Sequence, residues 1–158
     1  MRGWLGMGIV GLGLASPSLA VPPICTEAYE VILDVQYSGI FNSRTQVIDN
    51  EVDFCQAWDE IYSIQFPSPP CDTSQVDFTS QVAVVVALGE RPNGCYNLDI
   101  GCVARTPADR IGVVSVETVA GPTCVCTSAL VHPVAIAVID EPVLDVRFRS
   151  IIQSDSCP

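Results

Sequence analysis

One stretch of the chain has a hydrophobic pattern that differs from the rest. There, apolar side chains recur every three or four positions, which is the spacing of one buried face of a helix. The residues on this face are Phe54, Ala57, Trp58 and Ile61. Asn50 can cap such a helix, and the acidic residues that follow it suit the positive end of the helix. We therefore predict a short helix over residues 50–62, with Trp58 in the core, that ends before Pro67.

The remaining pattern favours β-strands. Residues 82–88 form an unbroken apolar run (VAVVVAL), which is typical of a central strand covered on both faces. The other predicted strands are residues 28–37, 44–49, 96–103, 111–119, 134–139 and 143–148. Strands at this spacing indicate a mainly β fold, either an antiparallel β-sandwich or a partly open barrel, with the helix packed across one end or face. We expect residues 140–142 to form a hairpin turn between the last two strands.

The first twenty residues have the pattern of a bacterial Sec-type signal peptide. Arg2 supplies a positive start, residues 4–15 are largely apolar, and residues 18–20 (Ser-Leu-Ala) form a small-x-small cleavage site. An uncleaved anchor is the alternative, but the apolar run is shorter than the roughly 20 residues of a membrane span. We expect residues 21–158 to form a single domain that is secreted or periplasmic, with no membrane insertion after cleavage.

Charge narrows the range of partners. The chain has 18 acidic residues against seven arginines, and its formal net charge is −11. Nucleic acids are bound by basic surfaces, and anionic lipids attract basic segments, so the composition argues against both as partners. The hydrophobic fraction of 49% is enough for a packed core, which argues against a disordered chain.

The cysteines indicate an oxidising compartment. Eight remain after the expected cleavage: Cys25, Cys55, Cys71, Cys95, Cys102, Cys124, Cys126 and Cys157. An even number in an exported chain indicates up to four disulfides. Cys55 and Cys71 flank the predicted helix and the loop after it, so we predict that they form one bond. Cys25 and Cys157 lie near the two ends of the chain and could tie them together.

The two cysteines of the Cys-x-Cys motif are expected to find partners elsewhere. On a strand, Cys124 and Cys126 would face the same side, so neighbours such as Cys95 or Cys102 are better partners for them than each other. Zinc is the alternative for such a motif, but the chain has no Cys-x-x-Cys, and His132 is its only histidine. We predict no metal site and no cofactor.

Enzymatic activity is not expected. A catalytic triad or a Cys-His pair would have to use His132, which precedes a predicted strand, where a surface or capping role is ordinary. Cysteines bonded in pairs supply no thiolate nucleophile. Acidic neighbours such as Asp140 and Glu141 lie at a turn, whereas a glycosidase needs two acids that converge in a cleft. We therefore predict no catalytic residue.

The most distinctive local sequence is Leu-Gly-Glu-Arg-Pro-Asn-Gly-Cys-Tyr at residues 88–96. Pro92 presets the first corner of a turn, and Asn93 and Gly94 both tolerate positive φ. One interpretation is therefore a hairpin turn between two strands. The other is a binding loop, because a rigid turn loses little conformational freedom when it binds.

The order of motifs over residues 30–149 resembles the PrcB family, a C-terminal domain found in protease-complex proteins that bacteria export. The matching motifs are Ser-Gly-Ile at 38–40, Trp58, Asp-Phe at 77–78, residues 88–96, and Ala-Gly-Pro at 120–122. The chain departs from the family pattern where Asn93 replaces a threonine and Cys95 replaces a glycine. A cysteine at that position suggests that a disulfide staples the turn.

This resemblance implies a non-enzymatic partner that associates with an extracellular protease and stabilises it. The same turn is similar, over a few residues, to the binding loop of chagasin-type protease inhibitors. That similarity implies an alternative, in which residues 90–96 enter a protease cleft as an inhibitor. Under either function, the residues expected to contact the partner are Arg91, Pro92, Asn93, Gly94 and Tyr96.

Overall fold

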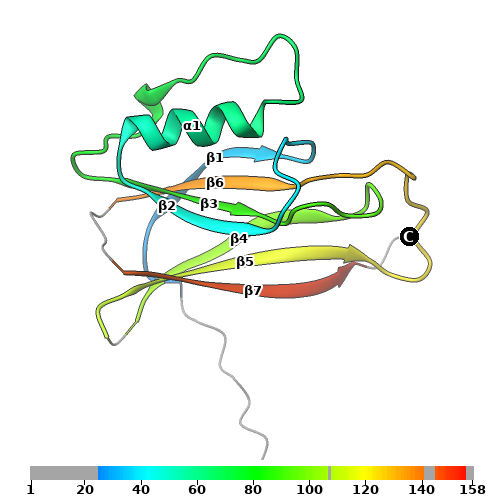
Figure 1. Cartoon of the computed structure of the whole chain (residues 1–158). Helices are drawn as coiled ribbons and strands as arrows, with labels where there is room; N and C mark the ends of the chain where they lie inside the picture. Colours follow the sequence, from blue (N-terminus) through cyan, green and yellow to red (C-terminus); the bar gives the residue numbers. More distant parts are fainter. Residues whose placement is uncertain (1–24, 107, 141–144, 156–158) are drawn as a thin grey trace, which may run out of the picture.

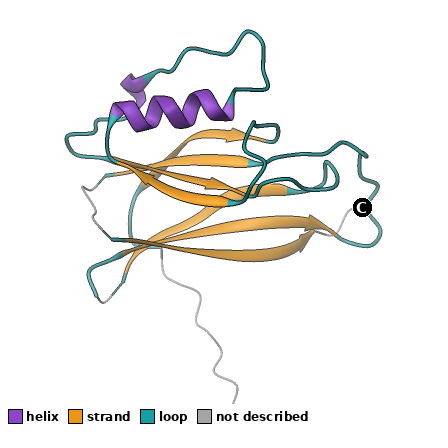
Figure 2. Cartoon of the chain, viewed as in Figure 1, coloured by secondary structure: helices purple, strands orange, loops and turns teal. Residues whose placement is uncertain are grey.

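Two β-sheets face each other, and a helix covers the outer side of one of them (Figure 1). The computed structural model describes residues 25–106, 108–140 and 145–155; the predicted signal peptide lies outside this range. The elements are β1 (Tyr29–Val35), β2 (Arg44–Ile48), α1 (Glu51–Ile61), η1 (Thr73–Gln75), β3 (Val82–Ala87), β4 (Asn97–Arg105), β5 (Ile111–Ala120), β6 (Val134–Ile139) and β7 (Val146–Asp155). One sheet has the order β1-β6-β3-β2 and the other β4-β5-β7. The predicted β-sandwich with a short helix is confirmed (Figure 2).

Strand β3 lies at the centre of the larger sheet, as its unbroken apolar run predicts. It pairs antiparallel with β2 on one side and β6 on the other, and all its residues are buried. Ala83 and Val85 pack on the helix side of the sheet, whereas Val84 and Val86 pack between the two sheets. Both faces of β3 are therefore apolar because each one contributes to a separate core.

The predicted hairpin between the last two strands is wrong. Strand β6 is paired on both edges, with β1 and β3, so it offers no edge to the strand that follows it. Strand β7 belongs instead to the smaller sheet, where it runs parallel to β5 from Val146 to Asp155. The apolar residues Val146 and Phe148 pack into the core between the sheets. The sandwich is thus mixed rather than wholly antiparallel.

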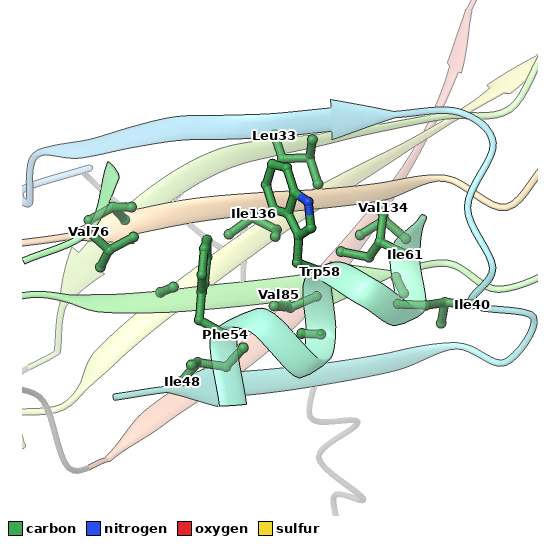
Figure 3. Packing of buried hydrophobic residues seen from close by; sticks show 14 residues of the cluster. Leu33, Ile40, Ile48, Phe54, Trp58, Ile61, Val76, Val85, Val134 and Ile136 are labelled. Carbon is green, nitrogen blue, oxygen red and sulfur yellow. The ribbon is translucent and has the colours of Figure 1, made fainter. Parts of the chain in front are cut away.

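The helix follows its sequence signals closely. The Oδ1 atom of Asn50 accepts a hydrogen bond from the backbone N–H of Asp53 (2.9 Å), which makes Asn50 the N-cap. The buried face consists of the four predicted residues, Phe54, Ala57, Trp58 and Ile61. Figure 3 shows this face against the larger sheet, with the Trp58 ring beside Leu33 and Ile136.

Three disulfides join cysteines within the described residues. Cys55 is bonded to Cys71 as the spacing predicts, and Cys95 is bonded to Cys126. The predicted bond between Cys25 and Cys157 is wrong, because Cys25 pairs with Cys102. The N-terminal segment runs along β4, where the N–H groups of residues 26 and 27 both donate to the carbonyl of residue 103. That docking brings Cys25 to β4 rather than to the C-terminal end, and Cys157 itself lies outside the described residues.

The Cys-x-Cys motif lies on no strand. Cys124 and Cys126 belong to the irregular connection between β5 and β6, so the two cysteines do not share one side of a strand.

Among the residues that the structure describes, no helix has the length and apolar character needed to cross a membrane.

Candidate functional site

Residues 88–96 join β3 to β4, and these strands belong to different sheets. The segment is therefore a crossover between sheets, and its interpretation as a hairpin turn is wrong. Its left-handed residue is Gly89, with φ of 73°, whereas Asn93 and Gly94 do not have positive φ. Glycine is needed at position 89 because the backbone turns there in close contact with residues 41–43.

Backbone hydrogen bonds fasten this 88–96 loop to the connection between β5 and β6. The N–H of Arg91 donates to the carbonyl of Val131 (2.8 Å), and the N–H of Val131 donates back to the carbonyl of Arg91 (3.1 Å). The N–H of Gly94 donates to the carbonyl of Thr127 (3.1 Å). A side chain at Gly94 would collide with the Thr127 hydroxyl, so glycine permits this close approach.

A disulfide and a side-chain amide complete the bracing of the loop. Cys95 is bonded to Cys126, as the resemblance suggested for a stapled turn. The Gln36 amide, which follows β1, donates to the carbonyls of Gly94 (2.8 Å) and Tyr96 (3.2 Å). The loop is thus held by two segments that are far from it in the sequence.

One of the five predicted contact residues is exposed. Pro92 lies in solvent, whereas the other four are half-buried: Arg91, Asn93, Gly94 and Tyr96. The Oδ1 atom of Asn93 accepts a hydrogen bond from the N–H of Cys95 (3.0 Å), which closes an Asx turn. Asn93 therefore shapes the loop as well as lying on it.

Arg91 forms an ion pair with Glu117, a residue of β5 that belongs to none of the sequence motifs. Their contacts are bidentate, with Nε 2.7 Å from Oε1 and Nη2 3.3 Å from Oε2. Glu117 is only 8% exposed, and the Arg91 guanidinium also lies 5.9 Å from the centre of the Tyr96 ring. The sequence signal that could have identified Glu117 is strand alternation, which places Val113, Ser115 and Glu117 on one face of β5.

A cleft of about 550 Å³ opens between the sheets beside the loop. We call it the inter-sheet cleft, and its lining comes from β2, β3, the 88–96 loop, β5 and β7. The lining residues are Ser43, Arg44, Thr45, Val86, Ala87, Leu88, Arg91, Ser115, Glu117, Phe148, Arg149, Ser150 and Ile152. Arg91 belongs to both features, so the loop and the cleft form one continuous candidate site.

His132 is buried, so of the surface and capping roles expected for it, the surface role is wrong. Its ring meets the edge of Phe41, with ring centres 4.6 Å apart, and its Nε2 lies 3.7 Å from a carboxylate oxygen of Glu90. Within the described residues, neither ring nitrogen has a hydrogen-bond partner. The backbone carbonyl of His132 accepts a hydrogen bond from the buried Ser38 hydroxyl (2.8 Å). The residue is buried because Phe41, between β1 and β2, and Glu90, in the 88–96 loop, both lie against its ring.

Removing the charge of Glu117 is expected to lower the free energy of unfolding. Glu117→Gln keeps the volume but replaces a charge-assisted contact to Arg91, at a cost of about 1–2 kcal/mol. The matched control is Glu60→Gln, whose ion pair with Arg44 is more exposed, with side chains 32% and 43% accessible. Its cost should stay below about 1 kcal/mol. Urea denaturation measures both, and equal losses would contradict the structural role given to Glu117.

No family model, no curated protein and no solved structure matches the chain.

Proposed function

We propose that this protein is a non-enzymatic binding module that works outside the cytoplasm, where it associates with a secreted protease and stabilises it. The contact surface is the 88–96 loop, with the exposed Pro92 at its tip. The observation that carries the proposal is the bracing of this loop by a backbone bridge, a disulfide and a bidentate ion pair. A loop fixed before it meets its partner loses less conformational freedom on binding.

The disulfides support the location. Each of the three bonds joins segments that are far apart in the chain, with sequence separations of 16, 31 and 77. Disulfides of this kind persist in oxidising compartments, such as the periplasm or the medium, and are rare in the cytosol.

The choice of a protease as partner rests on the resemblance, and two of the motifs that carry it lie together in the fold. Residues 38–40 and 88–96 both carry the resemblance, and they lie together around His132. Ser38 bonds to the carbonyl of His132, and the N–H of Glu90 donates to the carbonyl of Phe41 (3.0 Å). Motifs that are 50 residues apart in the sequence thus pack together, and because Ser38 and Ile40 are buried, residues 38–40 support the 88–96 loop rather than contact a partner.

The proposal predicts that the purified protein retains peptidase activity from the culture fluid of its source organism. Pro92→Arg adds bulk and charge at the exposed tip and should lower the retained activity by about tenfold or more, as expected for a central contact residue. Val52→Arg makes the same kind of change on the helix, at a side chain that is 77% exposed, and should retain full activity. Peptide-hydrolysis assays of the retained fraction measure the effect.

The same assay separates the two modes of association. A stabilising partner leaves the bound protease active and prolongs its half-life. An inhibitor with residues 90–96 in the protease cleft instead blocks peptide hydrolysis until the complex is dissociated. Retention of no peptidase, active or silenced, would contradict both modes. Equal retention by Pro92→Arg and by the unchanged protein would remove the loop as the contact surface.

A further inference from the structure

The two parallel strands of the smaller sheet, β5 and β7, end side by side. The last pair in their register is Ala120 with Asp155, and the N–H of Gly121 donates to the carbonyl of Asp155 (2.9 Å). A side chain at position 121 would collide with that carbonyl oxygen, so glycine permits the close approach. The residues that follow each strand therefore leave the sheet at the same end.

A turn after β5 brings Cys124 back to the end of β7. The N–H of Cys124 donates to the carbonyl of Gly121 (3.1 Å), which closes a β-turn with Pro122 at its first corner. Proline is favoured at this corner because its φ angle is already set. The Cys124 sulfur consequently lies 3.9 Å from the carbonyl oxygen of Asp155, which comes two residues before Cys157 in the sequence.

The remaining cysteines leave one partner for Cys124. The three disulfides described above use six of the seven described cysteines, and no described cysteine is free. Residues 1–24 contain no cysteine, so Cys157 is the one that remains in the sequence. Two residues of chain span at most about 7 Å between Cα atoms, and a disulfide joins Cα atoms about 4.4–6.8 Å apart. Cys157 is therefore within reach of the Cys124 sulfur beside Asp155.

We propose that Cys124 and Cys157 form a fourth disulfide, which acts as a covalent strap between the end of β7 and the Cys-x-Cys motif. The bond forms when the two thiols lose two electrons and two protons to an external disulfide, which is itself reduced to two thiols. Oxidants of this class are present in the compartments where the other three bonds persist. The inference concerns the fold around the candidate site and does not depend on the protease association.

The strap fastens a strand that few side-chain contacts hold. Every residue of β7 after Phe148 is exposed, and within the described ranges β7 pairs with β5 alone. A terminal edge strand with so little buried surface opens more easily than the core strands do. A covalent bond just beyond Asp155 keeps the end of β7 beside β5, so residues 149–155 stay paired.

The strap also explains why two cysteines lie one residue apart. Cys126 fastens the 88–96 loop through Cys95, and Cys124 fastens the end of β7. The loop contributes Arg91 to the lining of the inter-sheet cleft, and β7 contributes Ile152. The Cys-x-Cys motif thus links two walls of the cleft covalently.

Thiol mapping of single variants of the exported protein tests the pairing. Cys124→Ser, alkylated under denaturing and non-reducing conditions, should carry one label. Trypsin should place that label in residues 150–158, where Cys157 is the only cysteine. Cys126→Ser is the matched control, and its label should appear at Cys95 instead. A dimer of Cys124→Ser that is linked through Cys157 would equally report the released thiol.

Two results of the mapping would overturn the fourth disulfide. One is a released thiol in Cys124→Ser at any residue other than Cys157. The other is a free thiol at either position in the unchanged protein, which should take up no label.

Hydrogen exchange followed by mass spectrometry tests the strap itself. Serine at both Cys124 and Cys157 should speed exchange in residues 149–155 by about tenfold or more, and exchange in β3 much less. The control is serine at both Cys55 and Cys71, which removes a bond on the helix side and should not speed exchange in residues 149–155 relative to β3. Equal protection of residues 149–155 with and without the fourth bond would show that β7 needs no strap.

Discussion

Replacing Trp58 by alanine is expected to lower the free energy of unfolding by about 3–5 kcal/mol, because truncation of a buried aromatic removes its contacts and leaves a cavity. Trp58 is 7% exposed and packs between the helix and the larger sheet (Figure 3). Its ring centre lies 6.0 Å from that of Phe54 and 5.0 Å from that of Tyr62. The surrounding strands are paired, so the site cannot collapse to fill the space. Chemical denaturation monitored by circular dichroism measures the loss.

Two variants define what the Trp58 result means. Val52→Ala, on the exposed side of the same helix, should change stability by less than about 0.5 kcal/mol. Trp58→Phe keeps most of the apolar contact but removes the indole N–H that donates to the carbonyl of Pro69 (3.2 Å). It should cost less than the alanine variant but more than the Val52 control. An alanine variant as stable as the unchanged protein would show that the helix does not pack on the sheet as described.

The parts of the fold that local sequence determines were predicted well. The helix was expected over residues 50–62 and spans Glu51–Ile61, because its cap and its apolar face are both set within a dozen residues. The buried character of β3 followed from its unbroken apolar run. The helix depends on interactions between neighbours along the chain, and β3 depends on the burial of the whole segment. Both properties can be recognised in the sequence without knowing which other segments pack against these elements.

The pairing between distant segments could not be predicted in this way. Residues 143–148 were predicted to form a strand, but the sequence did not say which sheet the strand would join, since a hairpin with β6 and a parallel pair with β5 are compatible with the same residues. Cys25 was assigned to the far end of the chain for a similar reason, because sequence position does not reveal that its segment docks along β4.

The candidate site was predicted in part. Arg91 was identified from its motif, but its partner Glu117 was not, since a single acidic residue among 18 carries no special pattern until β5 is paired with β4. The inter-sheet cleft was missed for the same reason. It exists only because β2 and β7, which are about 100 residues apart, come to border one opening.

Removing the disulfide between Cys95 and Cys126 is expected to weaken both stability and protease association. These cysteines are 31 residues apart, and in the chain-entropy account of disulfides the loss from replacing both with serine is about 3–4 kcal/mol. The bond also holds the 88–96 loop against the connection between β5 and β6. Without it, the loop must lose more conformational freedom on binding, so the peptidase retained in the assay above should fall by about tenfold.

The pair Cys55 and Cys71 separates these two effects. Their bond closes a shorter segment, with a separation of 16, and its loss should cost about 3 kcal/mol. It fastens the helix to the residues that follow it and has no part in bracing the loop. Serine at both positions should therefore give a similar loss of stability but leave the retained peptidase unchanged. If the two double variants lose stability and peptidase in the same proportion, the disulfide acts on the fold as a whole, and the binding role of the braced loop is contradicted.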